Sequence, residues 1–307
     1  MKDRIGQWRS RLSLPLVAAP MFLISGPELV LAACRNGVIG SFPTPNARTV
    51  ADLDQWFDLI TSGLTEKDAP WAANVVVHRS NARLNEDLDL VMRYKAPLVI
   101  TALGSPRAIV ERVHEYGGLV FADVNSVPFA RKAVEAGVDG LVLVAAGAGG
   151  HTGNMTGFSF VPAVREFFDG PVILGGGIAD GAGIRAAEVL GADLAYMGTR
   201  FIACEESLAA PEYREMLVNS TVDDLILTRA ITGVTANWLK PSIARAGYDL
   251  DSMEKNPDVD FTDPQSGAKR WAHVWSAGHG VGLIDRTEPV VTLVARLKAE
   301  YEEARKR

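Results

Sequence analysis

The chain has 307 residues, 48% of them hydrophobic, and a formal net charge of −6 at pH 7. A chain of this length and apolar content can bury a large core, so its composition excludes an intrinsically disordered protein. With this negative net charge the sequence has no basic stripe that would neutralise phosphates, so a nucleic acid is not expected as a partner. The two cysteines, Cys34 and Cys204, are too few and too far apart for a disulfide scaffold or a thiolate metal site.

No targeting or membrane signal is expected. Residues 1–11 mix charged and polar side chains and contain no continuous apolar segment of the kind that a secretory signal needs. No uncharged apolar stretch reaches the ~18 residues of a membrane-spanning helix. The sequence therefore predicts a soluble cytoplasmic protein with no membrane partner, for which a homodimer is the default expectation.

Short apolar segments alternate with segments of helical periodicity over the first two thirds of the chain. This alternation is typical of repeated βα units and a parallel sheet. Pro106 suits a first helical turn and Gly137 a helix C-cap. The expected strands are 16–18, 38–41, 73–77, 98–101, 119–123, 140–144, 172–174 and 194–197, and the expected helices between them are 27–36, 51–64, 84–94, 106–116, 127–136 and 183–190.

The rhythm changes after Gly198. There the sequence predicts a helix over 211–217, an alternating segment over 225–231, a polar proline-containing segment over 249–267 and a final helix over 288–306.

Eight βα units favour a closed barrel over an open doubly wound sheet. We therefore predict an α/β fold, a TIM (β/α)8 barrel with a smaller, mainly helical lid inserted before the last helix. The barrel is expected to comprise residues 1–204 and 286–307, and the lid residues 205–285.

Glycines follow the last two expected strands, at the end of the barrel where such folds bind ligands and commonly a phosphate. Gly176 and Gly177 follow the seventh strand, and Gly198 and Thr199 follow the eighth. A lone glycine pair is more often a tight turn. Two glycine loops on consecutive strands can instead direct main-chain N–H groups at one phosphate, so the sequence predicts a monophosphate cofactor.

Two other strand ends carry candidate ligand contacts. Asn74 interrupts an apolar strand, where its amide costs free energy unless it is paired, and a ligand or a neighbouring backbone group would serve equally well. Pro20 and Met21 follow the first strand and suit either ordinary core packing or contact with a planar cofactor.

One imidazole, His151, stands in a loop with four glycines after the sixth expected strand. It is the best candidate for a general base, because imidazole can take a proton near neutral pH. His114 is expected to be structural, and a surface role explains His78 as well as a site role does. No His/Cys cluster or acidic triplet indicates a metal, and no G-x-S-x-G elbow indicates serine chemistry.

Six motifs occur in order along the chain: Pro20-Met21, Asn74, Ala148-Gly149-Gly150-His151-x-Gly153, the Gly-Gly-Ile-Ala-Asp-Gly run at 176–181, Met197-Gly198-Thr199-Arg200-Phe201 and Ser276-Ala277-Gly278-His279-Gly280. Together they resemble the nitronate monooxygenases, formerly called 2-nitropropane dioxygenases. The resemblance covers about residues 14–204 and resumes at 275–284.

The resemblance implies an FMN-containing barrel that oxidises alkyl nitronates with O2 to a carbonyl compound and nitrite, with residues 275–284 of the lid returning to the flavin site. His151 matches the family's catalytic histidine, which abstracts the proton α to a nitro group. The implied flavin contacts are Ala19, Pro20, Met21, Asn74, Gly149, Gly150 and Gly278, and the implied phosphate contacts are Gly176, Gly177, Gly198 and Thr199.

Four positions depart from the family pattern. Members often carry Glu where this chain has Gly147 and Gln where it has Val144, so polar flavin contacts are absent there. Asp123 stands where some relatives have Lys, and His279 replaces the Gln of an Ala-Gly-Gln-Gly motif. Asp123 and His279 are therefore further candidates, His279 as a second titratable group beside the ring.

Three other classes of protein fit part of the motif set. Flavin-dependent enoyl-acyl-carrier-protein reductases and NAD(P)H:quinone reductases share the barrel and much of the motif set, so an NAD(P)H-dependent reductase is the main alternative. The IMP dehydrogenase group needs a nucleophilic Cys after the sixth strand, where neither Cys34 nor Cys204 is placed. A non-catalytic FMN-binding module is the third, because the Glu and Gln of the family are missing.

Overall fold

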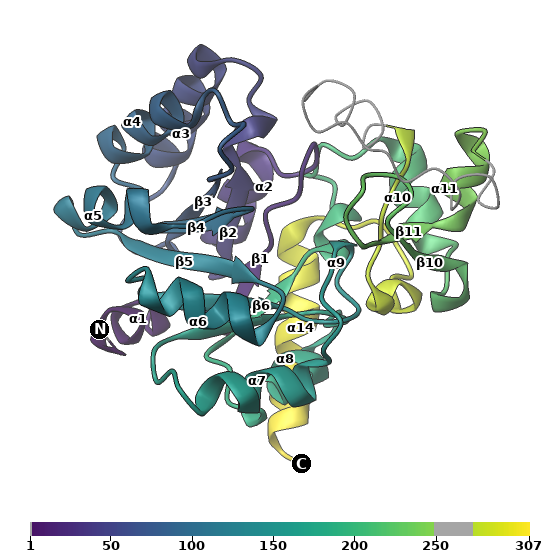
Figure 1. Ribbon diagram of the computed structural model, residues 1–307. Coiled ribbons are helices and arrows are strands. Elements are labelled where there is room, and N and C mark those ends of the chain that lie inside the picture. Colours follow the sequence, from purple (N-terminus) through teal and green to yellow (C-terminus); the bar gives the residue numbers. More distant parts are fainter. Residues whose placement is uncertain (1, 249–272) are drawn as a thin grey trace.

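The computed structural model describes residues 2–248 and 273–307. Eight parallel strands close into a barrel, because β1 pairs with β2 on one side and with β9 on the other (Figure 1). This closure confirms the predicted (β/α)8 barrel. The strands are β1 (Leu16–Ala18), β2 (Ile39–Pro43), β3 (Trp71–Val76), β4 (Leu98–Ala102), β5 (Leu119–Val124), β6 (Gly140–Val144), β8 (Val172–Gly175) and β9 (Leu194–Met197).

Helices cover the outside of the barrel, as parallel strands require a crossover between each pair. The last helix, α14, packs against α8 and α2, so it completes the ring at the point where the chain would otherwise leave a gap (Figure 1). The helices of the ring are α2 (Pro27–Arg35), α3 (Val50–Gly63), α4 (Leu84–Arg93), α5 (Arg107–Glu115), α6 (Val127–Glu135), α7 (Gly157–Arg165), α8 (Gly181–Val189) and α14 (Val290–Arg305).

Side chains alternate between the helices and the barrel interior along each strand. The interior is filled by one buried apolar cluster, to which α1 (Lys2–Arg9) contributes Ile5. This N-terminal helix was not among the predicted elements, and it caps the barrel at the end opposite the glycine loops. The strand residues of the cluster are Val17, Ile39, Ala72, Leu98, Ile100, Leu119, Phe121, Val142, Ile173 and Leu194.

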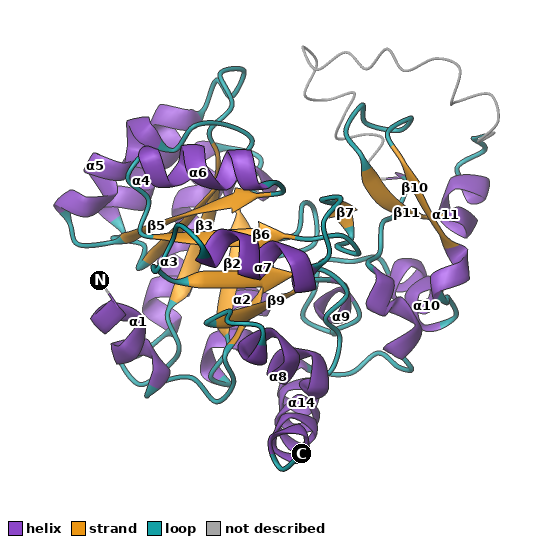
Figure 2. Ribbon diagram, turned by 60° about the horizontal axis from the view of Figure 1, so that its bottom comes forward, coloured by secondary structure: helices purple, strands orange, loops and turns teal. Residues whose placement is uncertain are grey.

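We call residues 205–285, between β9 and α14, the lid; its described parts, 205–248 and 273–285, lie at the carboxyl ends of the barrel strands (Figure 2). Its predicted helix at 211–217 is confirmed as α10, and the alternating segment at 225–231 begins with β10. The predicted polar segment at 249–267 lies outside the described residues. The described elements from β9 to α14 are α9 (Thr199–Ile202), α10 (Pro211–Val218), a 3-10 turn at Val222–Asp224, β10 (Leu225–Thr228), β11 (Ala236–Leu239), α11 (Lys240–Arg245) and a 3-10 turn at His279–Leu283.

The lid is not purely helical in its described part. β10 and β11 form an antiparallel sheet with β7 (Gly150–His151), which belongs to the glycine loop after β6 (Figure 2). Trp238 of β11 is fully buried beside Ile231, Ile243 and Val274. The lid therefore has its own apolar cluster and holds the glycine loop through a strand pairing.

Candidate active site

A cavity of about 1310 Å³ opens at the carboxyl ends of the barrel strands, beneath the lid. Every second side chain of a strand points into the barrel, and the last of these inward-pointing residues faces the cavity. Asn74 follows Ala72 in this way, Asp123 follows Phe121, and Tyr196 follows Leu194. We call this layer the cavity floor. It consists of Ala19, Asn74, Ala102, Asp123, Val144, Gly175 and Tyr196.

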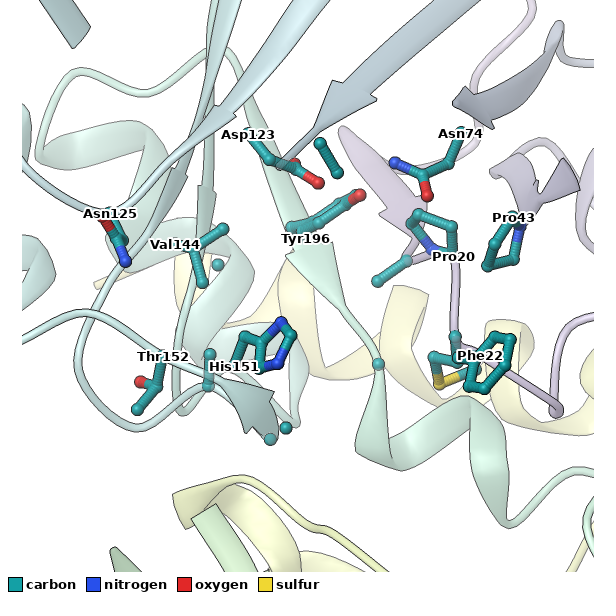
Figure 3. A pocket seen from close by; sticks show the side chains of 18 of the residues that line it. Pro20, Phe22, Pro43, Asn74, Asp123, Asn125, Val144, His151, Thr152 and Tyr196 are labelled. Carbon is teal, nitrogen blue, oxygen red and sulfur yellow. The ribbon is translucent and has the colours of Figure 1, made fainter. Parts of the chain in front are cut away.

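The predicted site residues converge on this cavity. It is lined by Ala19, Pro20, Met21, Asn74, Asp123, Gly149, Gly150, His151, Gly176, Gly177, Gly198, Thr199 and Gly278. Figure 3 shows His151, Asp123, Tyr196 and Asn74 around one space. Residues from seven different strand ends or loops thus meet where a (β/α)8 barrel places its ligand.

His279 is the exception among the candidates. It is exposed and is not among the residues that line the cavity, whereas its neighbours Gly278 and Gly280 are. Its ring lies against Gly147, where an added Cβ would come within 3.1 Å of the imidazole Cγ. The expectation that His279 stands beside the bound ring stays a prediction, since its ring lies next to the loops with Gly147 and Gly177 but does not line the cavity.

The glycine loops approach one another at backbone distance. A Cβ added to Gly149 would lie 2.7 Å from the Gly278 nitrogen, and one added to Gly278 would lie 2.6 Å from the Gly147 oxygen. The Gly278 N–H donates to Thr199 Oγ1 at 2.9 Å. The lid segment after residue 275 is therefore locked onto the loops that follow β6 and β9, and these glycines are required by close approach.

The loop after β8 adopts backbone conformations that favour glycine. Gly176 and Gly177 have φ values of +131° and +71°, in the left-handed region. The Gly177 N–H donates to Gly147 O at 3.2 Å. One of the N–H groups predicted to bind a phosphate is therefore already used in a hydrogen bond between the loops after β8 and β6. An added Cβ at Gly177 would meet only His279 Cβ, at 3.9 Å, so this side of the loop is open for a ligand.

His151 lies at the junction of barrel and lid. It pairs with Ala236 of β11, and Figure 3 shows its ring turned toward the cavity floor. Burial lowers the pKa of His151 from its usual value of 6.5, because the charged imidazolium loses solvation there. The ring is therefore neutral at pH 7 and can accept a proton.

The cavity floor carries three polar side chains. The Asn74 Nδ2 donates to Ile100 O at 3.1 Å, so its amide is anchored to β4. Asp123 Oδ1 and the Tyr196 hydroxyl are buried and have no hydrogen-bond partner. Sequence reasoning missed Tyr196, although the argument made for Asn74, a polar group within an apolar strand, applies equally to it.

The lid supplies the roof. Tyr213 and Trp275 stack with ring centroids 4.6 Å apart, and both line the cavity. The Tyr213 hydroxyl donates to Ser276 O at 2.5 Å. Asn237 of β11 donates through Nδ2 to Ala148 O at 2.7 Å, which ties the glycine loop to the lid.

These residues fit a flat cofactor that bears a phosphate. The open glycine loops after β8 and β9 suit the anionic end, Pro20 and Met21 offer apolar contact to a ring, and the unpaired oxygens of the floor suit a polar ring edge. Gly147 and Val144 add no polar side chain, so the floor and the glycine loops supply the hydrogen-bonding groups.

In the part of the chain that the structure describes, His, Cys, Asp and Glu side chains do not gather in groups of three or more that could hold a metal ion. Over residues 2–248 and 273–307, no helix has both the length and the apolar character needed to cross a membrane.

Fold and site together define a (β/α)8-barrel protein with a cofactor-sized cavity at its strand ends, lined by glycine loops and one imidazole. Comparison with known families is consistent with this class. The chain belongs to the nitronate monooxygenase family, whose profile matches residues 9–300.

The chain is also similar to individual proteins. The chain is 27% identical to the nitronate monooxygenase of Paraburkholderia phytofirmans, over 99% of this chain and 98% of that protein. It is 33% identical to a probable nitronate monooxygenase of Staphylococcus aureus, over 68% of this chain and 64% of that protein. It is also 27% identical to the (3aS,4S,5R,7aS)-5-hydroxy-7a-methyl-1-oxo-octahydro-1H-indene-4-carboxyl-CoA dehydrogenase of Rhodococcus jostii, over 76% of this chain; the match spans 64% of that relative's length.

Solved structures share the whole architecture. FabK from Thermotoga maritima superposes with a TM-score of 0.83 at 26% identity, over 100% of this chain and 97% of that one. The nitroalkane oxidase from Streptomyces ansochromogenes superposes with a TM-score of 0.82 at 24% identity, over 98% of this chain and 99% of that one, a likeness that concerns the fold alone.

Proposed function

We propose that this protein is an FMN-dependent oxidoreductase that oxidises alkyl nitronates with O2 to a carbonyl compound and nitrite. The observation that carries the proposal is one juxtaposition: a neutral, half-buried imidazole at position 151 faces the same cavity as the glycine loops after β8 and β9. Membership of the nitronate monooxygenase family supports it.

In this proposal the loops with Gly176, Gly177, Gly198 and Thr199 hold the FMN phosphate. The ring contacts are assigned to Ala19, Pro20, Met21, Asn74, Gly149, Gly150 and Gly278, which line the same cavity. When bound, FMN supplies the electron acceptor that the oxidation requires. Residues 1–204 and 286–307 carry the cofactor in this scheme, and residues 205–285 cover it.

His151 acts as the general base toward a neutral nitroalkane. The imidazole takes the proton from the carbon α to the nitro group, which leaves a nitronate anion beside an imidazolium cation. The two opposite charges attract, so the base also holds the anion that it creates. Burial by Tyr213 and Trp275 of the lid excludes water and strengthens this attraction.

An NAD(P)H-dependent flavin reductase, of quinone or enoyl-acyl-carrier-protein type, is the second candidate. The observation that favours it is the size of the cavity, since 1310 Å³ exceeds the ~300–1,000 Å³ usual for small-molecule sites and leaves room for a larger second substrate. The likeness to FabK and to a carboxyl-CoA dehydrogenase points the same way.

A spectrum of the purified protein decides between these activities. The absorption of the bound flavin is followed without O2 after addition of propionate 3-nitronate, and separately after addition of NADH. Bleaching by the nitronate supports the proposal, and rapid bleaching by NADH alone supports the reductase. A coloured protein that neither compound bleaches would indicate a non-catalytic FMN-binding module.

A further inference from the structure

Two oxygen atoms on the cavity floor have no hydrogen-bond partner. Asp123 Oδ1 at the end of β5 and the hydroxyl of Tyr196 at the end of β9 are both buried, and Figure 3 shows the two side chains pointing toward one another. Gly175 makes room for the phenol, because a Cβ there would lie 3.1 Å from the Tyr196 Cβ. The fold thus keeps an unpaired acid and an unpaired phenol next to each other.

Within residues 2–248 and 273–307, the other buried carboxylates are paired by groups of the protein. Asp87 accepts from Thr44 at 2.8 Å and from the Arg83 guanidinium at 2.8 Å. Asp139 accepts from the Val120 N–H at 2.8 Å and contacts His114 at 2.7 Å. A buried polar group without a partner costs folding free energy, so its place at a ligand cavity indicates that the partner is the ligand.

We propose, on the basis of the function proposed above, that Asp123 and Tyr196 bind the polar edge of the flavin ring and that the Asp123 carboxylate takes up one proton when the ring is reduced. The reductant would give the ring the equivalent of a hydride, two electrons with one proton, which leaves one negative charge on it, and a buffer acid would give one further proton to Asp123 Oδ1 while its conjugate base stays in solution. The protonated carboxyl then donates a hydrogen bond to the electron-rich ring, where a carboxylate would repel it.

The surroundings of Asp123 suit this role. Its partner on β6 is the apolar Val142, and the apolar Ala102 of β4 and Val144 of β6 line the cavity on the same side of the sheet. Figure 3 shows the titratable Tyr196 and His151 in this part of the cavity, and the other titratable residues known to line it among the described residues are Arg107, Lys132, Glu135 and Tyr213. Burial raises the pKa of Asp123 to about 7, and burial together with the smaller effect of the Asp123 charge raises the pKa of Tyr196.

The first test is the flavin midpoint potential of the FMN-loaded protein, measured between pH 5.5 and 8.5 against reference dyes. The wild type is expected to show an extra fall of potential with pH above about 7, and Asp123→Asn to lose that extra dependence, since the amide donates a hydrogen bond but cannot titrate. The matched control is Asp89→Asn on α4, which removes the charge of an exposed carboxylate and should keep the wild-type profile.

Tyr196→Phe tests the second member of the pair. It removes one hydrogen bond to the ring, so the dissociation constant of FMN should rise by on the order of ten-fold while the pH dependence of the potential remains.

A stability measurement separates this role from a merely structural one. Without FMN, Asp123→Asn and Tyr196→Phe should unfold at the same temperature as the wild type or a higher one, because each removes an unpaired buried oxygen or its charge. A structural role predicts lower unfolding temperatures.

The outcomes distinguish the two proposals. If the wild-type protein cannot be loaded with FMN, the proposed function fails and this inference fails with it. If FMN binds but Asp123→Asn leaves the pH dependence of its potential unchanged, the inference is overturned while the proposed function stands.

Discussion

His151 and Ala236 are partners in an antiparallel strand pair, one from the glycine loop of the barrel and the other from the lid. The neighbouring pair, Gly150 with Asn237, adds a side-chain bond from Asn237 to Ala148 O. The candidate base is therefore positioned by the lid as much as by the barrel. A lid that moved away would release the histidine from its place above the cavity floor.

Replacing His151 with Ala should lower the rate with a neutral nitroalkane by about 10²- to 10⁴-fold, the usual contribution of a general base. FMN absorption should persist, because the glycine loops that hold the cofactor are unchanged. The rate with a nitronate prepared beforehand should fall much less, since its proton is already gone. Stopped-flow spectra with the two substrate forms check this, and equal losses with both would contradict the role of base.

The lowered pKa of His151 has a consequence for stability. Below pH ~6.5 the unfolded chain protonates this imidazole while the folded protein does not, so stability falls as the pH drops through that value. Above it the group is neutral in both states and contributes nothing. Urea unfolding at pH 7.5 and 5.5 should show a smaller loss in His151→Gln than in the wild type, and an equal loss would show that the shift is absent.

Gly149→Ala should separate the lid from the barrel. Its Cβ would lie 2.7 Å from the Gly278 nitrogen and 2.9 Å from the Ala277 carbon, both backbone atoms that cannot swing away. We expect a loss of about 1–3 kcal/mol in the free energy of unfolding and weaker FMN binding.

The control is Gly6→Ala in α1, where an added Cβ meets nothing within 4 Å. Because alanine favours a helix over glycine, this variant should gain about 0.5–1 kcal/mol. Thermal unfolding followed by circular dichroism compares the two, and a Gly149→Ala variant as stable as the wild type would mean that the loops are not locked together.

Asn237→Ala should weaken the same junction from the lid side. The side chain is 2% exposed and its amide donates to Ala148 O at 2.7 Å, so the change leaves a carbonyl without this donor. We expect a loss of about 1–3 kcal/mol in stability and a lower rate of proton abstraction, because the histidine loop is less well held. Asn219→Ala, at an exposed position after α10, should change neither quantity.

Much of the barrel follows from local patterns. Segments such as 140–144 and 194–197 are short apolar runs between helical segments, and the structure confirms both strands at the same bounds. The glycines at 176 and 177 mark a loop for the same local reason, since their positive φ values are a property of the turn itself. Burial and φ preferences act within a few residues, so a single sequence is enough to predict them.

The tertiary structure alone decided which side chains meet. The alternation along β9 puts Tyr196 on the inner side of the strand, but only closure of the barrel brings it beside Asp123, 73 residues earlier in the sequence. Likewise the motif around Gly278 does not reveal that His279 is exposed, or that His151 joins a lid sheet with β11. Strand closure and loop packing depend on contacts between distant segments, and those contacts exist only once the chain has folded.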